Sequence, residues 1–200
     1  MRYMRKYGRL GLLLLAVALV VLMQQAQGLQ ESYASEMVRF HVLANSDSEE
    51  DQEVKLKVRD RVGGYISELL KDAGSREETM EILEAHIGDI ERVAAQEIRC
   101  QGYSYDVTAS LEQEDFPVKT YGRYHLPAGE YTSLQIRIGE AEGANWWCVA
   151  YPNMCFMDSV YEVVNQSEKE QLYQVFTLYE YRKLIESPNK EIRWRFFSET

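Results

Sequence analysis

Two of the three tryptophans and two of the three cysteines fall within one run of twelve residues, Asn145-Trp146-Trp147-Cys148-Val149-Ala150-Tyr151-Pro152-Asn153-Met154-Cys155-Phe156. Aromatic and sulfur-bearing side chains bury large areas, so we expect this run in the core and not on the surface. Proline and asparagine at its centre are typical turn residues. The run therefore predicts a hairpin with its loop at residues 150–153, in which position 149 pairs with 154 and position 148 with 155.

The hairpin would place Cys148 opposite Cys155. Directly opposed residues have Cβ atoms ~4.5–5.5 Å apart, and a disulfide prefers ~3.5–4.5 Å, so modest adjustment would allow a bridge. The closed loop would contribute about 2.5 kcal/mol to stability in the chain-entropy model. The alternative is a pair of reduced cysteines packed as small apolar residues. In either case Cys100 is expected to be an unpaired thiol.

Three segments that precede this run have the alternating pattern of half-buried strands: residues 37–42, 103–111 and 132–138. Residues 116–125 are rich in aromatics but lack periodicity, which indicates a structural loop. Residues 139–145 are expected to be a flexible, acidic turn. The glycines of this turn lack the following helix and the Lys-Ser/Thr pair of a phosphate-binding loop.

Two amphipathic helices are predicted between the first and second strands. Ser46 and Glu49 fit a capping box at the start of the first helix. Ser75 and Glu78 form another box, followed by one helix with an apolar stripe from position 80 to position 98, in which His86 is an ordinary helical residue. Sequential helices joined by a short loop are expected to form an antiparallel hairpin.

The C-terminal part of the chain predicts a third helix and a last strand. Ser167 and Glu170 fit a further capping box, and the apolar face of the helix would hold Leu172, Val175, Phe176 and Tyr179. Residues 192–196 alternate like a terminal strand. The whole order predicts a single α+β domain over residues 36–200, with a helical hairpin and a C-terminal helix packed on a mainly antiparallel sheet.

The N-terminal segment, residues 1–28, has the form of a secretory signal peptide. A short basic region up to Arg9 precedes fourteen apolar residues, Leu10 to Met23, and small residues follow at Ala26 and Gly28. The apolar run is shorter than the ~18 residues of a membrane span. We favour cleavage, with an uncleaved anchor as the alternative. In both cases the domain lies outside the cytoplasmic membrane, where a disulfide can form.

The charge balance disfavours two classes of partner. The chain has 22 basic and 32 acidic residues. Four of the basic residues and none of the acids lie in the leader, so 18 basic residues remain against 32 acidic ones, a net charge of -14. Such a surface repels nucleic acid and anionic lipid. We therefore expect no nucleic-acid partner and contact with the membrane only through the leader.

One locally basic segment stands out on the acidic domain: Lys55, Lys57, Arg59 and Arg61 in the first predicted helix. The simpler interpretation is a solvated helix face between core positions. The alternative is an electrostatic docking face for a protein partner.

No catalytic or metal-binding constellation is visible in the sequence. The three histidines, His41, His86 and His125, are far apart and none belongs to a closely spaced ligand pair. Cys148 has apolar neighbours that favour an inert, buried sulfur. We therefore predict no catalytic residue, no metal and no cofactor, and a protein that is not an enzyme. The alternative is a secreted cysteine- or carboxylate-dependent hydrolase, whose nucleophile would react with a thiol label if it were a cysteine.

Several motifs together resemble the stage II sporulation protein R family of endospore-forming bacteria. They are Arg39-Phe40-His41-Val42-Leu43-Ala44-Asn45-Ser46-Asp47-Ser48, Lys57-Val58-Arg59-Asp60, Thr120-Tyr121-Gly122, Leu126-Pro127-Ala128-Gly129-Glu130-Tyr131, Ile138-Gly139-Glu140 and Asn145-Trp146-Trp147-Cys148-Val149. The family usually has two prolines between the paired cysteines, whereas this chain has Pro152 followed by Asn153.

The resemblance implies a secreted signalling protein without chemistry of its own. It implies synthesis in the forespore, export into the space between the forespore and mother-cell membranes, and activation of a membrane-embedded aspartic protease. That protease would process the precursor of the transcription factor sigma-E. The partner, the location and the activation are expectations from the family and do not follow from composition or periodicity.

Overall fold

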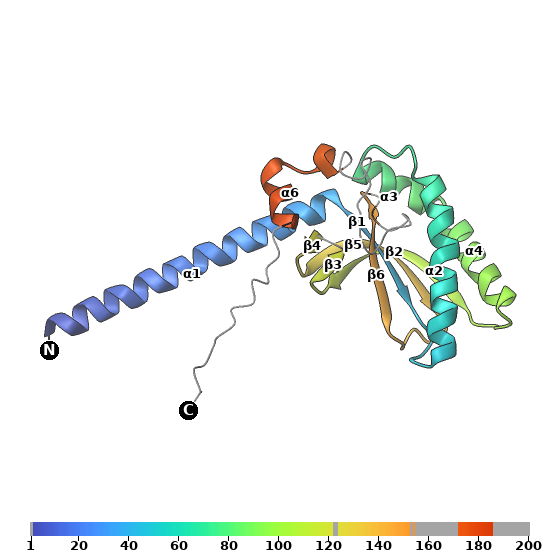
Figure 1. Ribbon diagram of the computed structural model, residues 1–200, viewed down its shortest axis with the longest axis horizontal. Coiled ribbons are helices and arrows are strands. Elements are labelled where there is room, and N and C mark those ends of the chain that lie inside the picture. Colours follow the sequence, from blue (N-terminus) through green and yellow to red (C-terminus); the bar gives the residue numbers. More distant parts are fainter. Residues whose placement is uncertain (1, 122–123, 153, 155–171, 186–200) are drawn as a thin grey trace, which may run out of the picture.

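The computed structural model describes residues 2–121, 124–152, 154 and 172–185. Its elements in chain order are α1 (Arg2–Glu36), β1 (Val38–Leu43), α2 (Glu49–Leu69), α3 (Arg76–Ala85), α4 (Ile87–Cys100), β2 (Val107–Phe116), β3 (Lys119–Tyr121), β4 (Tyr124–Leu126), β5 (Gly129–Ile138), β6 (Asn145–Tyr151) and α6 (Leu178–Ile185). Figure 1 shows α1 projecting from one end of the domain, with α2 and α4 at the opposite end.

A four-stranded sheet of order β2-β5-β1-β6 forms the centre of the domain. β1 pairs in parallel with β5 and antiparallel with β6, and β2 pairs antiparallel with β5. The predicted α+β class with a mainly antiparallel sheet is confirmed, with one parallel pair. The prediction of a loop at residues 116–125 is wrong, because β3 and β4 pair antiparallel within and just beyond it as a second small sheet.

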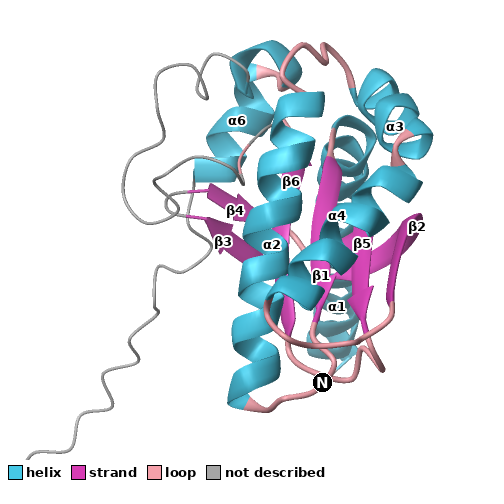
Figure 2. Cartoon of the chain, turned by 90° about the vertical axis from the view of Figure 1, so that its right-hand side faces the viewer, coloured by secondary structure: helices cyan, strands magenta, loops and turns pink. Residues whose placement is uncertain are grey.

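The apolar face of the main sheet is covered by helices. Phe40 and Val42 of β1 lie in register with Leu134 and Ile136 of β5, and all four side chains are fully buried. Alternation along each strand puts these side chains on one face. Figure 2 shows α2 and α4 in front of this face. Their buried stripes are Val54, Val58, Val62 and Ile66 in α2, and Ile90, Ala94 and Ile98 in α4.

The helix starts follow the capping rules, but not always at the predicted residue. Ser75 is the N-cap of α3, as predicted, and accepts a hydrogen bond from the N–H of Glu78 at 3.1 Å. The prediction of Ser46 as the cap of α2 is wrong. Ser48 takes this role and accepts from the N–H of Asp51 at 3.1 Å. The Ser46 hydroxyl donates instead to the Asp51 carboxylate at 2.5 Å.

The predicted second helix is divided into α3 and α4 at His86, so the prediction of one continuous helix is wrong. His86 has φ −113° and ψ 10°, and its Nδ1 lies 2.8 Å from the carbonyl oxygen of Ile82. The break gives the two pieces different packing partners: α3 contacts β1 and β2, whereas α4 packs mainly on α2 and β2. His86 is therefore a junction residue and not an ordinary helical one.

The predicted C-terminal helix also bends, between a helical turn at residues 172–175 and α6. Tyr179, expected on the buried face, is 61% exposed, whereas Tyr181 and Leu184 are buried. A reciprocal cap explains the new start, because the Thr177 N–H donates to Glu180 Oε2 at 2.7 Å and the Glu180 N–H donates to Thr177 Oγ1 at 3.4 Å. The expected box at Ser167 and Glu170 and the strand at 192–196 lie outside the described residues.

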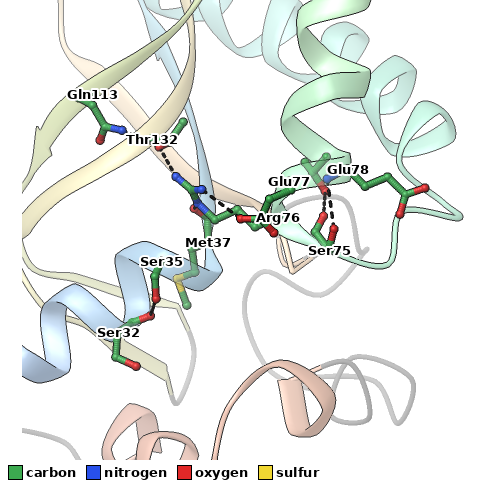
Figure 3. Close-up of polar contacts among 10 residues, drawn as sticks. Ser32, Ser35, Met37, Ser75, Arg76, Glu77, Glu78, Gln113 and Thr132 are labelled. Carbon is green, nitrogen blue, oxygen red and sulfur yellow. Dashed lines mark hydrogen bonds and ion pairs between the residues drawn. The ribbon is translucent and has the colours of Figure 1, made fainter.

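The last turns of α1 are part of the domain. Tyr33 is 1% exposed, packs edge-on against Phe176 with ring centroids 5.5 Å apart, and donates its hydroxyl to the carbonyl of Glu180 at 2.8 Å. Beyond α1, Arg76 of α3 donates to the carbonyl of Met37 at 3.3 Å and to the Thr132 hydroxyl at 2.6 Å (Figure 3). The packed core thus includes residues that precede position 36.

The turn between β5 and β6, residues 139–144, passes over the end of β1, because β1 lies between these two strands. We call these six residues the crossing loop. The N–H groups of Glu142 and Gly143 donate to the carbonyls of Asn45 at 3.2 Å and Ala44 at 3.0 Å. The Asn45 side chain accepts from the Glu140 N–H at 3.1 Å. The expected flexible turn is therefore held by defined partners.

The residues after β1 hold the crossing loop and the start of α2 together. Asp47 Oδ1 accepts from the Ala144 N–H at 2.6 Å. Asp51 is nearly buried and accepts from Asn45 Nδ2 at 2.8 Å as well as from Ser46. Burial by itself would raise the pKa of Asp51, but hydrogen bonds from Ser46, Asn45, Tyr105 and Ser48 outweigh it and hold the pKa below its usual value.

Substitution of Gly143 by alanine should destabilise the protein, because a Cβ at this position would overlap the backbone carbonyl of Ser46. We expect a loss of about 1–3 kcal/mol in the free energy of unfolding, measured by urea denaturation. Gly64→Ala is the matched control. Gly64 lies in α2 with open space around its Cα, so alanine should add roughly 0.5–1 kcal/mol. Equal effects of the two substitutions would contradict the crossing-loop geometry.

Candidate functional site

The most unusual chemistry among the described residues lies on the face of the sheet opposite α2 and α4. Arg39 and His41 alternate with Phe40 and Val42 along β1 and therefore point to this second face. Arg39 is fully buried and His41 is 1% exposed. Arginine is rarely buried completely without partners, so the surroundings of Arg39 are the candidate site.

Arg39 is held by two hydrogen bonds and three aromatic rings. Its Nε donates to the carbonyl of Cys148 at 2.9 Å, and its Nη2 donates to the Tyr121 hydroxyl at 2.9 Å. Its guanidinium carbon lies 4.2 Å from the ring centre of Phe116, 5.0 Å from Tyr131 and 5.8 Å from Tyr121. Cation–π contacts of a desolvated arginine contribute up to about 2 kcal/mol.

Burial controls the ionisation of this cluster. It lowers the pKa of Arg39, while the neighbouring tyrosines act in the opposite direction. Burial also raises the pKa of Tyr121, and it raises the pKa of Tyr131 to about 12 against the opposing effect of the Arg39 charge. Tyr121 and Tyr131 therefore remain neutral hydrogen-bonding groups near neutral pH, and neither is a base.

His41 lies beside Arg39 and stacks on Trp147, with ring centroids 3.7 Å apart and an interplanar angle of 12°. Its Nδ1 is 2.7 Å from Glu114 Oε1, which is ion-pair distance, but the approach does not have hydrogen-bond geometry. Gln135 Nε2 donates to the same carboxylate oxygen at 3.0 Å. Arg39 Nη1, His41 Nε2 and Ser133 Oγ are buried without a protein partner among the described residues.

This arrangement holds strands together. Tyr121 joins β3 to the main sheet, because it also donates to the carbonyl of Trp147 at 3.1 Å. A general base must reach the proton it removes, and the imidazole of His41 is closed off by Trp147 and Phe116. The side chain of Glu114, the carboxylate beside His41, is 19% exposed.

The histidines and cysteines do not converge on a site in the described part of the chain. His86 lies at the α3–α4 junction, and His125 pairs with Thr120 Oγ1 at 2.9 Å. Cys148 is 2% exposed in the core, whereas Cys100 is an exposed free thiol at the end of α4. Within the described residues, no group of three or more His, Cys, Asp or Glu side chains could hold a metal ion.

The structure separates the four basic residues that the sequence suggested as a docking face. Lys55 is 5% exposed and donates to the carbonyl of Ala144 at 2.8 Å, so it supports the crossing loop. Arg59 lies 5.1 Å from the ring centre of Trp146 and pairs with Asp60 at 2.6 Å. Only Lys57 and Arg61 are exposed, one helical turn apart on α2.

The sequence pattern located the buried network only in part. Alternation in β1 placed Arg39 and His41 on the second face, but this pattern usually means exposure to solvent. Their partners Tyr121 and Glu114 are 82 and 73 positions away and come from segments without a recognisable site motif. The one available signal was that Arg39, Tyr121 and Trp147 all belong to motifs that carry the family resemblance.

Fold and site together define a class of protein. It is a compact α+β domain that follows an apolar N-terminal helix, and its buried Arg39 and His41 pack within the domain. The sequence profile of the family Stage II sporulation protein R matches residues 34–161. The chain is 36% identical to Stage II sporulation protein R of Bacillus subtilis (strain 168) over 135 residues, which are 67% of this chain and 60% of that relative. The matched region thus spans 60% of the relative's length. No solved structure gives a significant match.

The chain therefore belongs to the stage II sporulation protein R family, and the resemblance seen in the sequence is confirmed. A role in sporulation follows from this membership. The matched residues begin near the end of α1 and include every strand of the described structure. The apolar part of α1 precedes the match and is compatible with a signal peptide.

Replacement of Tyr121 by phenylalanine should destabilise the protein, because it removes the acceptor of Arg39 and the donor to Trp147 while keeping the ring. We expect a loss of about 1–3 kcal/mol in the free energy of unfolding. Tyr179→Phe is the matched control, since Tyr179 is 61% exposed and should change stability by less than about 0.5 kcal/mol. Arg39→Lys should not preserve stability, because lysine lacks the planar fork of donors.

The predicted bridge between Cys148 and Cys155 keeps its status as a prediction, because Cys155 lies outside the described residues. The Met154 N–H donates to the Val149 carbonyl at 3.4 Å, which agrees with the expected 149–154 pair of the hairpin. Non-reducing peptide mapping of exported protein should recover both cysteines in one linked peptide pair. Alkylation of both thiols without prior reduction would show that the bridge is absent.

Proposed function

We propose that this chain is an exported sporulation signal that binds and activates a membrane-embedded aspartic protease, which then processes the precursor of sigma-E. Family membership across residues 34–161 is the observation that carries this proposal. The chain acts as a ligand that favours the active state of the protease through differential affinity, without turnover of its own. Its location is the space between the forespore and mother-cell membranes.

Three structural features support a binding role. The part of α1 from Gly11 to Glu36 is long and apolar enough to cross a membrane, and signal sequences share these properties. The polar network around Arg39 is buried, which suits a rigid ligand better than an open active site. α1 and α2 lie at opposite ends of the domain (Figure 1), so a domain held at one membrane by α1 would present α2 to the opposite one.

The competing candidate is a secreted hydrolase that uses a cysteine or a carboxylate. Cys148 is closed off in the core, so it does not favour this candidate. The partly exposed Glu114 beside His41 is the one feature that favours it. An enzyme and a ligand differ in stoichiometry, which gives a direct test.

In a reconstitution of the mature chain with its candidate protease and the precursor, we expect processing to rise with the amount of chain added and to saturate at a fixed molar ratio. A ligand that does not turn over can activate only as many protease molecules as it occupies. The measurement is cleaved precursor against the ratio of chain to protease. Complete activation by a small fraction of an equivalent would instead indicate an enzyme that modifies the protease.

Within this proposal, the exposed pair Lys57 and Arg61 is the docking surface that remains from the four basic residues Lys55, Lys57, Arg59 and Arg61. The double charge reversal Lys57→Glu/Arg61→Glu should weaken activation and reduce its dependence on salt, with the urea midpoint unchanged. Arg92→Glu/Arg99→Glu on α4 is the control with the same change in net charge at exposed positions. Activation that is unaffected across a salt series would leave Lys57 and Arg61 as a solvated helix face.

A further inference from the structure

Most of the large exposed apolar side chains of the domain gather at the end from which α1 leaves, and the exception is Leu56 on α2 at the opposite end. Outside α1, the large apolar residues exposed among the described residues are Leu56, Val118, Tyr173, Leu178 and Tyr179. Tyr173, Leu178 and Tyr179 come from the helical turn at 172–175 and from α6, and they are 54%, 65% and 61% exposed. Val118 directly precedes β3, whose partner β4 contacts α6. Figure 1 shows α6, β3 and β4 grouped beside the end of α1.

α6 is fastened to α1 by specific contacts, so its position relative to that helix is defined. The Tyr33 hydroxyl donates to the carbonyl of Glu180, and the Ser32 hydroxyl bonds the Glu180 carboxylate. On its other side, Tyr181 of α6 packs against Tyr124 of β4, with centroids 6.3 Å apart. α6, which carries the exposed Leu178 and Tyr179, is therefore held beside the last turns of α1.

The length of α1 places this group near a membrane surface. A hydrocarbon core of ~30 Å takes about 20 helical residues. The unbroken apolar run ends at Met23, but the helix continues through residues 24–28, and α1 from Gly11 onward is long and apolar enough to cross a membrane. Counted from Leu10, which follows the last basic residue of the leader, a span of this length ends near Leu29. Ser32 and Tyr33 lie three and four positions later, which is ~5–6 Å along the helix. The headgroup layer on each side is about 5–7 Å thick, so the residues that hold α6 fall within it.

The composition of α6 fits this layer. Membrane interfaces typically contain tyrosine and leucine beside lysine and arginine. The tyrosine rings and leucine side chains enter the boundary of the acyl region, and the cationic groups lie among the lipid phosphates. Arg182 and Lys183 are both exposed, and Lys183 Nζ lies 6.0 Å from the ring centre of Tyr179. Glu180, the carboxylate of α6, is engaged by Ser32 and Thr177; burial would raise its pKa, but these hydrogen bonds keep the pKa low. Exposed Glu31 and Glu130 lie near the end of α1, so apolar insertion and not net charge must drive the contact.

We infer that Tyr173, Leu178 and Tyr179, with Arg182 and Lys183, form a surface that lies on the phospholipid headgroups of the membrane entered by α1. This lipid-contact surface sets the domain against one membrane and turns α2 away from it. It adds a second membrane contact to the one through the leader, which was the only contact that the charge balance predicted. The inference rests on retention of α1 in the membrane, as in the uncleaved-anchor alternative, and does not depend on activation of a protease.

The test uses the full chain reconstituted in phosphatidylcholine vesicles, with integration checked by resistance to alkaline extraction. In a Cys100→Ser background, Tyr179→Cys carries an environment-sensitive fluorophore, and Gln96→Cys, exposed on α4, is the matched control. The Cys100→Ser chain without a new cysteine measures background labelling. We expect several-fold stronger quenching of the label at 179 than at 96 by lipids that carry a spin label at a shallow acyl position.

Leu178→Asp should then reduce the quenching at 179 while leaving the urea midpoint unchanged, because Leu178 is 65% exposed. These vesicles contain no other protein, so quenching at 179 reports contact with lipid alone. A label at 179 as accessible to water as the label at 96, or a chain that does not integrate, would overturn the inference. In the first case a protein partner, and not lipid, would be expected to cover the lipid-contact surface.

Discussion

The insertion of β1 between β5 and β6 is the constraint on which the other parts of the structure depend. It forces the crossing loop over the end of β1, where the backbone groups of the loop need partners that it cannot provide for itself. Asn45, Asp47 and Lys55 provide them. Asp51, in the first turn of α2, accepts hydrogen bonds from Asn45 and from Ser46. One short segment after β1 thus fixes both the sheet order and the direction in which the main helix leaves it.

The same insertion creates the buried network on the second face. β1 is a central strand, and the rings of Phe116, Tyr121 and Tyr131 cover Arg39 on the second face, so its charge must be accommodated inside. A carbonyl, a hydroxyl and three aromatic faces surround the guanidinium in place of a close carboxylate partner. Removal of one partner of a buried charge costs more than the intact contact contributes. The network therefore ties β3 to the main sheet.

The two ends of the domain have different surfaces. At one end the last turns of α1, α6 and the small sheet of β3 and β4 expose tyrosine, leucine and two cations. At the other end α2 exposes Lys57 and Arg61 on a domain that is acidic as a whole. Such a difference suits the location between two membranes that we propose, because one end would face the membrane entered by α1 and the other would face a partner. The orientation of α1 relative to the sheet sets which end is which.

The sequence by itself determined the fold class, most of the helices and strands, and the family, because these depend on periodicity and motifs that are local in the chain. It determined the cap at Ser75 for the same reason. Tertiary structure decided what local pattern leaves open: the choice of Ser48 over Ser46 as a cap, the break at His86 and the bend before α6. Ser46 does not cap α2 because its hydroxyl donates to the Asp51 carboxylate. Tyr179 is exposed because the cap formed by Thr177 and Glu180 begins α6 after a bend. The burial of Arg39 and His41 could not be predicted, since alternation tells which face a side chain takes and not what covers it. The covering residues lie up to 109 positions away, and only the folded sheet brings them together.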